Sequence, residues 1–207
     1  TRGNHPIVNK LFKAEEDYSK IREFVKQTNE VIAYGNGRCY GDSAFAEAMF
    51  STKKLNTFIS FDRLNGILEC ESGVLLSEIL DITVPQGYFL AITPGTKFIT
   101  LGGAIASNIH GKNHHAEGGF SECVIEFKMM VEDGEIITCS REENAEKFWA
   151  TFGAMGLTGI ILSAKIKLKN IESAYIRQES IKAENLDEIC QLFEESEDWT
   201  YTVAWID

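Results

Sequence analysis

Basic residues are scarce in this chain, and it has neither an apolar run long enough to cross a membrane nor the apolar stretch of a signal peptide at its start. Lys and Arg number 20 against 31 Asp and Glu, which gives a net charge of −11 over 207 residues. Nucleic acids and anionic membranes are bound by positive surfaces, so this charge argues against both as main partners. No apolar run reaches about 18 residues, so no transmembrane helix is predicted. The first ten residues, TRGNHPIVNK, contain no apolar stretch of the kind found in signal peptides.

Cysteine and proline are also sparse. The five cysteines include no CxxC pair, and an odd, scattered set is typical of reduced thiols in a cytosolic protein. We therefore expect a cytoplasmic protein, in which any association with a membrane comes through the substrate or a partner. With three prolines and no low-complexity tract, the chain shows no linker. Its 44% hydrophobic and 25% charged residues are typical of a soluble globular fold.

The spacing of apolar residues predicts an α+β fold. Helical spacing occurs in residues 17–28, 75–84, 100–109 and 143–153. Asn65-Gly66 and Asp133-Gly134 lie between apolar runs and predict two β-hairpins. Further strands are expected at 30–33, 88–95 and 158–169. Only the first quarter has a β-α-β pattern, which favours α+β over a doubly wound sheet. Residues 173–207 are expected to form strand, helix and strand, as the beginning of another domain.

The segment YGNGRCYGDS, residues 34–43, follows a predicted strand and has three glycines. Its GxGxxxG spacing differs from the GxGxxG of a Rossmann fingerprint, and no clear helix follows. It also lacks the Gly-Lys-Ser/Thr of a P-loop. Two interpretations remain open for this segment alone. One is a nest of backbone N–H groups that binds an anion such as a pyrophosphate, and the other is an ordinary tight turn.

Two further segments have little side-chain bulk. In residues 93–111, TPGTKFITLGGAIASNIHG, small residues begin a predicted helix, where a phosphate or a planar ring can approach the backbone. In residues 153–161, GAMGLTGII, a glycine recurs at every third position. For the first segment, the alternative is close packing of a helix on a sheet. For the second, a plain connection between a helix and a strand is an equally good interpretation in isolation. The segments 34–43 and 93–111, about 60 residues apart, together favour a ligand.

The histidines cluster in residues 109–120, IHGKNHHAEGGF. His114 and His115 are adjacent and no nearby Asp or Cys completes a ligand set, so we expect no metal. His110 follows the small-residue helix, and a hydrogen-bonded polar histidine without a catalytic role is the simpler interpretation of it. No Ser-His-Asp order, GxSxG or paired-carboxylate motif is present. The demanding chemistry is therefore expected to come from a cofactor.

Four segments together resemble one family. GNGRCYGDS, PGTKFITLGGAIASNIHGKNHHAEGGF, FWATFGAMGLTGII and the terminal YTVAWID resemble FAD-linked oxidoreductases of the vanillyl-alcohol-oxidase type, which have a PCMH-type FAD-binding domain. The resemblance implies an FAD-binding domain over residues 1–172, made of two α+β subdomains at about 1–72 and 73–172. Residues 173–207 would then begin a truncated substrate or cap domain. The family's C-terminal return to the FAD domain is absent from this sequence.

The resemblance also implies site residues. His110 and Lys112 fall where the family's catalytic site faces its substrate. The positions implied to bind the cofactor are Ala33, Tyr34, Gly35, Asn36, Gly37, Arg38, Cys39, Tyr40, Gly41, Asp42, Ser43, Pro94, Gly95, Thr100, Leu101, Gly102, Gly103, Ser107, Asn108, Ile109, His110, Gly111, Gly156, Thr158, Gly159 and Ile161. Arg38 stands where some members carry a histidine that attaches FAD covalently. A guanidinium forms no such link but pairs with phosphate oxygens, so we expect FAD to be bound non-covalently.

The activity implied by the resemblance is oxidation of a secondary alcohol of a sugar. The 2-hydroxyl of a polyprenylphosphoryl pentose would become a ketone, as half of an epimerisation. A short-chain NAD(P)-dependent reductase would be the partner that reduces the ketone. The alternative enzyme is a sugar-lactone or alditol oxidase that uses oxygen. The alternative from another class is a non-catalytic FAD-binding module.

Overall fold

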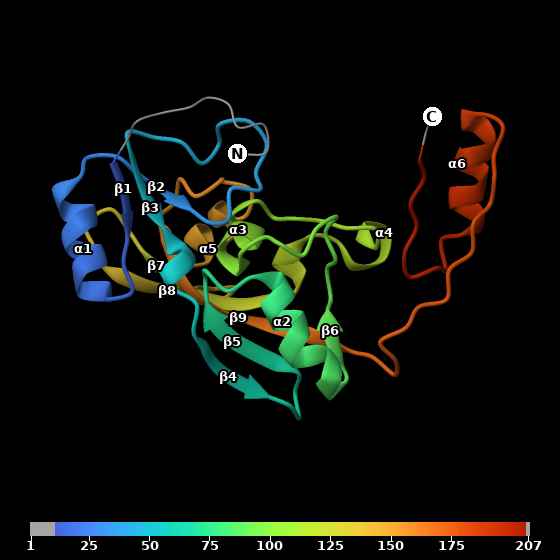
Figure 1. Cartoon of the computed structure of the whole chain (residues 1–207), viewed down its shortest axis with the longest axis horizontal. Coiled ribbons are helices and arrows are strands. Elements are labelled where there is room, and N and C mark those ends of the chain that lie inside the picture. The colour runs from blue at the N-terminus through green and yellow to red at the C-terminus, as the bar shows by residue number, and fades with distance from the viewer. Residues whose placement is uncertain (1–10, 206–207) are drawn as a thin grey trace.

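The computed structural model describes residues 11–205, which form a body and an arm (Figure 1). The body contains a small and a large sheet, and residues 173–205, called here the C-terminal arm, extend from it and carry helix α6 (Leu186–Glu195). The small sheet is parallel, with strand order β1-β3-β2. Its strands are β1 (Leu11–Ala14), β2 (Val31–Tyr34) and β3 (Ala48–Ser51).

Helix α1 (Tyr18–Gln27) connects β1 and β2 and begins at a capping residue. The carboxylate of Asp17 accepts a hydrogen bond from the backbone N–H of Ser19 at 2.8 Å, which satisfies one of the free donors at the start of the helix. Hydrogen bonds from the Ser19 side chain and backbone hold the pKa of Asp17 below its ordinary value. Ile21 and Val25 are one turn apart and are both buried, so α1 covers the body with one face.

The large sheet is antiparallel and is organised around one long strand, β9 (Ile160–Asn170). The strand order is β4-β5-β9-β7-β8, and β6 pairs with the last residues of β9. The other strands are β4 (Phe58–Asp62), β5 (Ile67–Glu71), β6 (Tyr88–Leu90), β7 (Val124–Met130) and β8 (Ile136–Ser140). Gly66 and Gly134 both have positive φ at the tips of the β4–β5 and β7–β8 hairpins, so the two predicted hairpins are confirmed.

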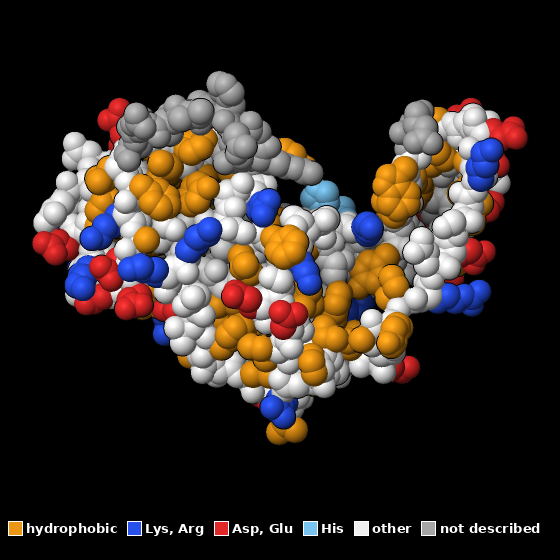
Figure 2. All heavy atoms as spheres, in the orientation of Figure 1, with side chains coloured by type: hydrophobic (Ala, Val, Ile, Leu, Met, Phe, Trp, Pro, Cys, Tyr) orange, Lys and Arg blue, Asp and Glu red, His pale blue; other side chains and the backbone are white. Residues whose placement is uncertain are grey.

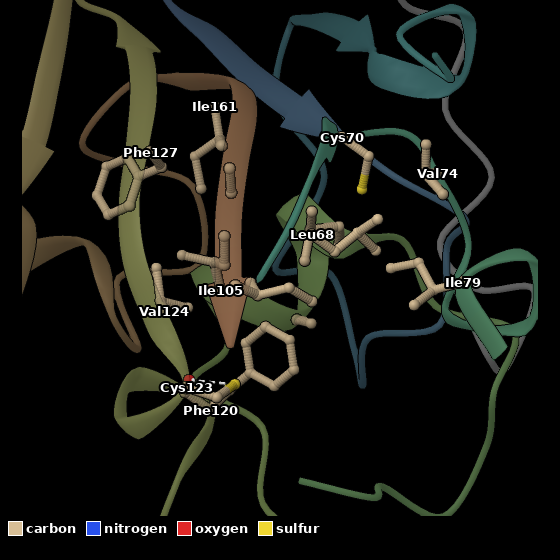
Figure 3. Packing of buried hydrophobic residues seen from close by; sticks show 14 of the residues in the cluster. Leu68, Cys70, Val74, Ile79, Ile105, Phe120, Cys123, Val124, Phe127 and Ile161 are labelled. Carbon is tan, nitrogen blue, oxygen red and sulfur yellow. Dashed lines mark hydrogen bonds between the residues drawn. The ribbon is translucent and has the colours of Figure 1, made fainter. Parts of the chain in front are cut away.

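The main hydrophobic core lies between the large sheet and short helices. Figure 3 shows Leu68 and Cys70 of β5, Phe127 of β7 and Ile161 of β9 in this core, together with Ile105 from a helix. The aromatic rings of Phe127 and Phe148 stack with centroids 5.5 Å apart. The helices of the body besides α1 are α2 (Leu76–Thr83), α3 (Leu101–Ala106), α4 (His114–Glu117) and α5 (Ala145–Thr151), with 3-10 turns at Thr52–Lys54, Val84–Gln86 and Phe120–Glu122.

A second buried cluster joins the small sheet to the large one. Ile21 of α1 and Phe50 of β3 pack there with Leu162 of β9. A polar contact reinforces this junction, because the Tyr18 hydroxyl donates a hydrogen bond to the carboxylate of Glu71 at 3.1 Å. The other oxygen of Glu71 accepts from the backbone N–H of Thr57 at 2.9 Å. The cofactor-binding positions predicted on the two sheets are therefore held in a fixed relation.

Burial, together with the negative charge and hydrogen bond of Glu71, raises the pKa of Tyr18 to about 12 from 10.0. A raised pKa contributes stability that is complete below pH 10 and is lost as the pH rises towards 12. We expect Tyr18→Phe to lower the free energy of unfolding by about 1 kcal/mol at pH 8, because the hydrogen bond is lost. In urea unfolding, the difference in the free energy of unfolding between the unmodified protein and Tyr18→Phe should disappear between pH 10 and 12. A difference that stays constant over that range would contradict the assignment. The buried thiols of Cys70 and Cys123 also have raised pKa values. Their effect on stability at alkaline pH is common to both proteins and cancels in the difference.

The α+β class is confirmed, and the four predicted helices are present within a few residues of the expected ends. Strands β1 and β3 were not predicted. The strands predicted on either side of α6 are wrong: among residues 173–205, the only regular element is α6. These arm segments have no neighbouring strand in the described structure, and an extended segment without a partner leaves its backbone groups unpaired. Residues 1–10 and 206–207 of the predicted domains lie outside the described residues. The subdomain boundary near residue 72 stays a prediction.

Candidate functional site

The structure brings the first two glycine segments into direct contact. Gly35, just after β2, lies so close to Thr100 that a Cβ at position 35 would be 2.4 Å from the Thr100 hydroxyl oxygen. The side-chain amide of Asn36 donates to the backbone carbonyl of Phe98 at 2.8 Å. Loop 34–43 is therefore fixed against residues 98–100, although more than 60 positions separate them in sequence.

The third glycine segment, residues 153–159, lies beside the same two. A Cβ at Gly156 would be 3.5 Å from the side chain of Ile32 and 3.8 Å from that of Ala33, at the end of β2. The backbone N–H of Met155 donates to the carbonyl of Ala106 in α3 at 2.9 Å. All three segments thus meet around the end of β2 and helix α3, and this convergence was not predictable from any one of them.

Helix α3 shows which glycines serve packing and which leave open surface. The Thr100 side chain caps α3 by accepting from the N–H of Gly103 at 3.2 Å. A Cβ at Gly102 would be 2.9 Å from the Cβ of Ser72, so Gly102 allows close packing inside the body. At Gly41 and Gly95, by contrast, an added Cβ would meet no atom of residues 11–205 within 4 Å. Within this part of the chain, no packing contact requires a glycine at these two positions.

After α3 the chain turns sharply and presents the candidate catalytic residues. Gly111 is pressed against Thr93, because a Cβ there would be 2.0 Å from the Thr93 carbonyl oxygen. His110 and Lys112 on either side of it are exposed. The His110 ring lies 5.2 Å, between centroids, from the ring of His114 in α4. A histidine and a lysine therefore project from one rigid turn at the end of α3.

The C-terminal arm contacts this turn and helix α4 at three points. The backbone N–H of Thr202 donates to the carbonyl of Lys112 at 3.0 Å. His115 Nε2 lies 2.9 Å from the carbonyl oxygen of Trp199, and the Lys112 ammonium lies 5.8 Å from the ring centre of Trp205. Figure 2 shows the hollow between body and arm, with pale blue histidine side chains and a blue basic side chain beside it. Part of this hollow is a cavity of about 370 Å³, which is lined by Lys112 from the body and Phe193 from the arm, among others.

Most predicted site residues are at least partly accessible, and four are buried. The buried ones are Thr100, Leu101, Gly156 and Ile161. Leu101 and Ile161 belong to the hydrophobic core, so their side chains face the protein interior, and a role for them at the cofactor stays a prediction. Sequence reasoning assigned no role to Met155, which has a left-handed backbone with φ +54, or to Trp205, whose exposure is 75%. The sequence holds no local signal for either placement.

The chemistry of this region fits an anionic, extended cofactor. Loop 34–43 carries the exposed side chain of Arg38, and among the described residues no atom would meet a Cβ at Gly41 in the same loop or at Gly95. Backbone N–H groups and a guanidinium are the donors that phosphate oxygens prefer. Within residues 11–205 no group of His, Cys, Asp or Glu is arranged to hold a metal ion. No helix in the same range is long and apolar enough to cross a membrane.

Comparison with known families agrees with this geometry: residues 10–140 match the FAD binding domain family. The match covers more than half of the chain, and the chain belongs to this family. The matched region contains loop 34–43, α3 and the turn with His110 and Lys112.

Individual relatives include several oxidoreductases. The chain is 35% identical to decaprenylphosphoryl-beta-D-ribose oxidase of Mycolicibacterium smegmatis, over 98% of this chain and 46% of the relative. It is 27% identical to L-gulonolactone oxidase of Mus musculus, over 69% of this chain and 32% of the relative. It is 26% identical to cytokinin dehydrogenase 2 of Arabidopsis thaliana, over 73% of this chain and 31% of the relative. The chain therefore spans less than half the length of each of these relatives.

Proposed function

We propose that this chain is the FAD-binding part of an oxidoreductase that converts a secondary alcohol of a sugar to a ketone. The observation that carries the proposal is the convergence of three glycine segments beside the turn that presents His110 and Lys112. The match of nearly the whole chain to an oxidase of a lipid-linked ribose supports a polyprenylphosphoryl pentose as substrate, with its 2-hydroxyl as the reacting group.

The chain's own residues divide into two groups under this proposal. Loop 34–43 would hold the diphosphate through its N–H groups and Arg38, while residues 95–103 and 107–111 would line the flavin. FAD, when bound, supplies the two-electron oxidation that no side chain here can perform. His110 and Lys112 would bind and orient the sugar or its phosphate, since both are exposed on the turn after α3. Orientation of a reactant in this way contributes a large part of many enzymatic accelerations.

The cofactor is expected to be bound without a covalent link, because Arg38 has no nucleophilic atom suited to attach a flavin. Acid precipitation of the yellow holoprotein should leave the colour in the supernatant. The control is Arg38→His, which places an imidazole at the same position and tests whether attachment is possible there. Yellow colour in the pellet of the unmodified protein would contradict this prediction.

The substrate proposal is tested by the visible spectrum of the holoprotein. Flavin absorption should bleach when a polyprenylphosphoryl pentose is added without oxygen, and a 2-deoxy analogue should leave it unchanged. Readmission of air separates the alternatives, because fast reoxidation would favour the sugar-lactone or alditol oxidase that L-gulonolactone oxidase represents. A flavin that binds but is never bleached by sugars or lactones would favour a non-catalytic module.

The arm is proposed to begin a substrate domain. Helix α6 buries none of its side chains, and Leu186 and Phe193 leave an apolar face exposed. A short-chain NAD(P)-dependent reductase is the proposed partner, because a ketone made by the oxidation requires a reductant to complete an epimerisation. Addition of a polyprenylphosphoryl pentose to Trp149→Phe protein should change the emission of the remaining Trp199 and Trp205. An unchanged emission at saturating sugar would count against a substrate role for the arm.

A further inference from the structure

The segment between α3 and His110 contains a backbone conformation that an ordinary side chain rarely adopts. Asn108 has φ +40, the left-handed region that only glycine, asparagine and aspartate enter without much strain. Its backbone N–H still bonds to the carbonyl of Ile105 at 2.9 Å, so the reversal occurs directly after the C-cap residue of α3, Ser107. The chain therefore changes direction at Asn108, two residues before His110.

The Asn108 side chain bonds to the protein body, where the residue is partly buried. Its Oδ1 accepts a hydrogen bond from the backbone N–H of Ser121 at 2.9 Å. A Cβ at Gly119 would lie 2.9 Å from the same oxygen, so Gly119 leaves the space that this amide occupies. Next to this contact, the N–H of Phe120 donates to the carbonyl of Ile109 at 2.8 Å. Residues 108–109 are thus bound to residues 119–121 by two adjacent hydrogen bonds.

Residues 119–121, to which residues 108–109 are hydrogen-bonded, are fixed in the protein core. Phe120 is completely buried in the main core, and Figure 3 shows it beside Cys123 below Ile105. The carbonyl of Ser121 also accepts from the guanidinium of Arg141 at 3.1 Å. Asn108 therefore ties the turn that carries His110 to a fixed part of the core.

We propose that Asn108 is a positioning residue, which sets the direction of His110 through its left-handed backbone and its bond to Ser121. Gly111, pressed against Thr93, holds the chain on the other side of His110. With one anchor two residues before and one directly after, the histidine has little freedom to move with its backbone. The inference rests on the proposed function only for the role of His110 towards substrate, because the geometry itself is independent of activity.

Three replacements separate the two properties of Asn108. Asn108→Asp keeps both the acceptor oxygen and the tolerance of positive φ. Asn108→Gly keeps only the tolerance of positive φ, and Asn108→Ala keeps neither. The readout is NMR of the holoprotein with labelled histidines, in which the through-space contact between the His110 and His114 rings is measured. His110→Gln and His114→Gln assign the signals.

The expected result is a His110–His114 contact that is retained in Asn108→Asp and is lost or shifted in both Asn108→Gly and Asn108→Ala. Flavin reduction by a polyprenylphosphoryl pentose should be about 10²-fold slower in Asn108→Gly than in Asn108→Asp, the effect expected of a small displacement near the reacting atoms. A contact that survives in Asn108→Gly overturns the proposal, and so does an Asn108→Gly protein that fails to fold, because Asn108 would then serve stability. If no sugar bleaches the unmodified flavin, the proposed function fails while the NMR result still decides the role of Asn108.

Discussion

Replacing Gly111 by alanine is expected to lower the free energy of unfolding by about 3 kcal/mol and to reduce flavin reduction about 10²-fold. The added Cβ would lie 2.0 Å from the carbonyl oxygen of Thr93 and 2.5 Å from its carbonyl carbon. Both atoms belong to the backbone, so no side-chain rotation relieves the overlap. The turn carrying His110 and Lys112 must move instead. Urea unfolding and anaerobic flavin bleaching measure the two effects.

Gly95→Ala is the matched control for this experiment. Position 95 also lies in the second glycine segment, but a Cβ there meets no atom of residues 11–205 within 4 Å. Its free energy of unfolding should stay within about 0.5 kcal/mol of the unmodified protein, as for most surface changes. Equal stability of Gly111→Ala and Gly95→Ala would show that residue 111 does not contact Thr93 as described.

Replacing Gly35 by alanine is expected to weaken FAD binding about 30-fold, which corresponds to about 2 kcal/mol. The new methyl group would lie 2.4 Å from the hydroxyl oxygen of the buried Thr100. Thr100 must then rotate and lose the bond by which it caps α3, or the two segments predicted to bind the cofactor must separate. Titration of the apoprotein with FAD, followed by quenching of flavin fluorescence, measures the change in affinity.

The double variant Gly35→Ala/Thr100→Ala distinguishes a local overlap from a general defect. Replacing Thr100 by alanine removes its hydroxyl and leaves its Cβ. That Cβ is 3.5 Å from the new methyl group at position 35, which is an ordinary contact. We expect the double variant to lose less FAD affinity than the sum of the losses in the two single variants. Double-mutant cycles of contacting residues deviate from additivity in this way. Strict additivity would mean that the contact between Gly35 and Thr100 does not set the affinity.

The elements that could be predicted from sequence are those with local signals. Asn65-Gly66 and Asp133-Gly134 fix the two hairpins through the backbone conformation that a tight turn requires. Helix α1 has a capping aspartate and apolar residues one turn apart. Each signal lies within a few residues of the element it produces, so no knowledge of the remaining fold is needed.

Elements that depend on distant partners could not be predicted. Strand β3 is only four residues long and is buried throughout, so it has no alternation of apolar and polar residues. It is a strand because β1 and β2 pair with it on both sides. The arm segments beside α6 are the opposite case, since their sequence favours strands but no partner strand is present among the described residues.

The candidate site shows the same division. The sequence identified the glycine segments and His110 but not the contacts that give them their roles. Gly35 matters because of Thr100, and Gly111 because of Thr93. The side chain of Asn108, whose backbone is left-handed, accepts a hydrogen bond from an N–H group thirteen residues further along. Contacts of this kind are properties of the assembled fold.

The central position of β9 has a consequence for the order in which the protein assembles. Strand β5 pairs with residues about 100 positions later in the chain, with Ile67 opposite Lys167. During synthesis at about 5–20 residues per second, β5 therefore waits roughly 5–20 s before its partner exists. Loop 34–43 and α3 leave the ribosome early, but the sheet that supports them closes only once β9 has been made. The predicted cofactor loops can therefore reach the described arrangement only after β9 has been made, and a nascent chain that ends before residue 160 lacks the strand that pairs with both β5 and β7.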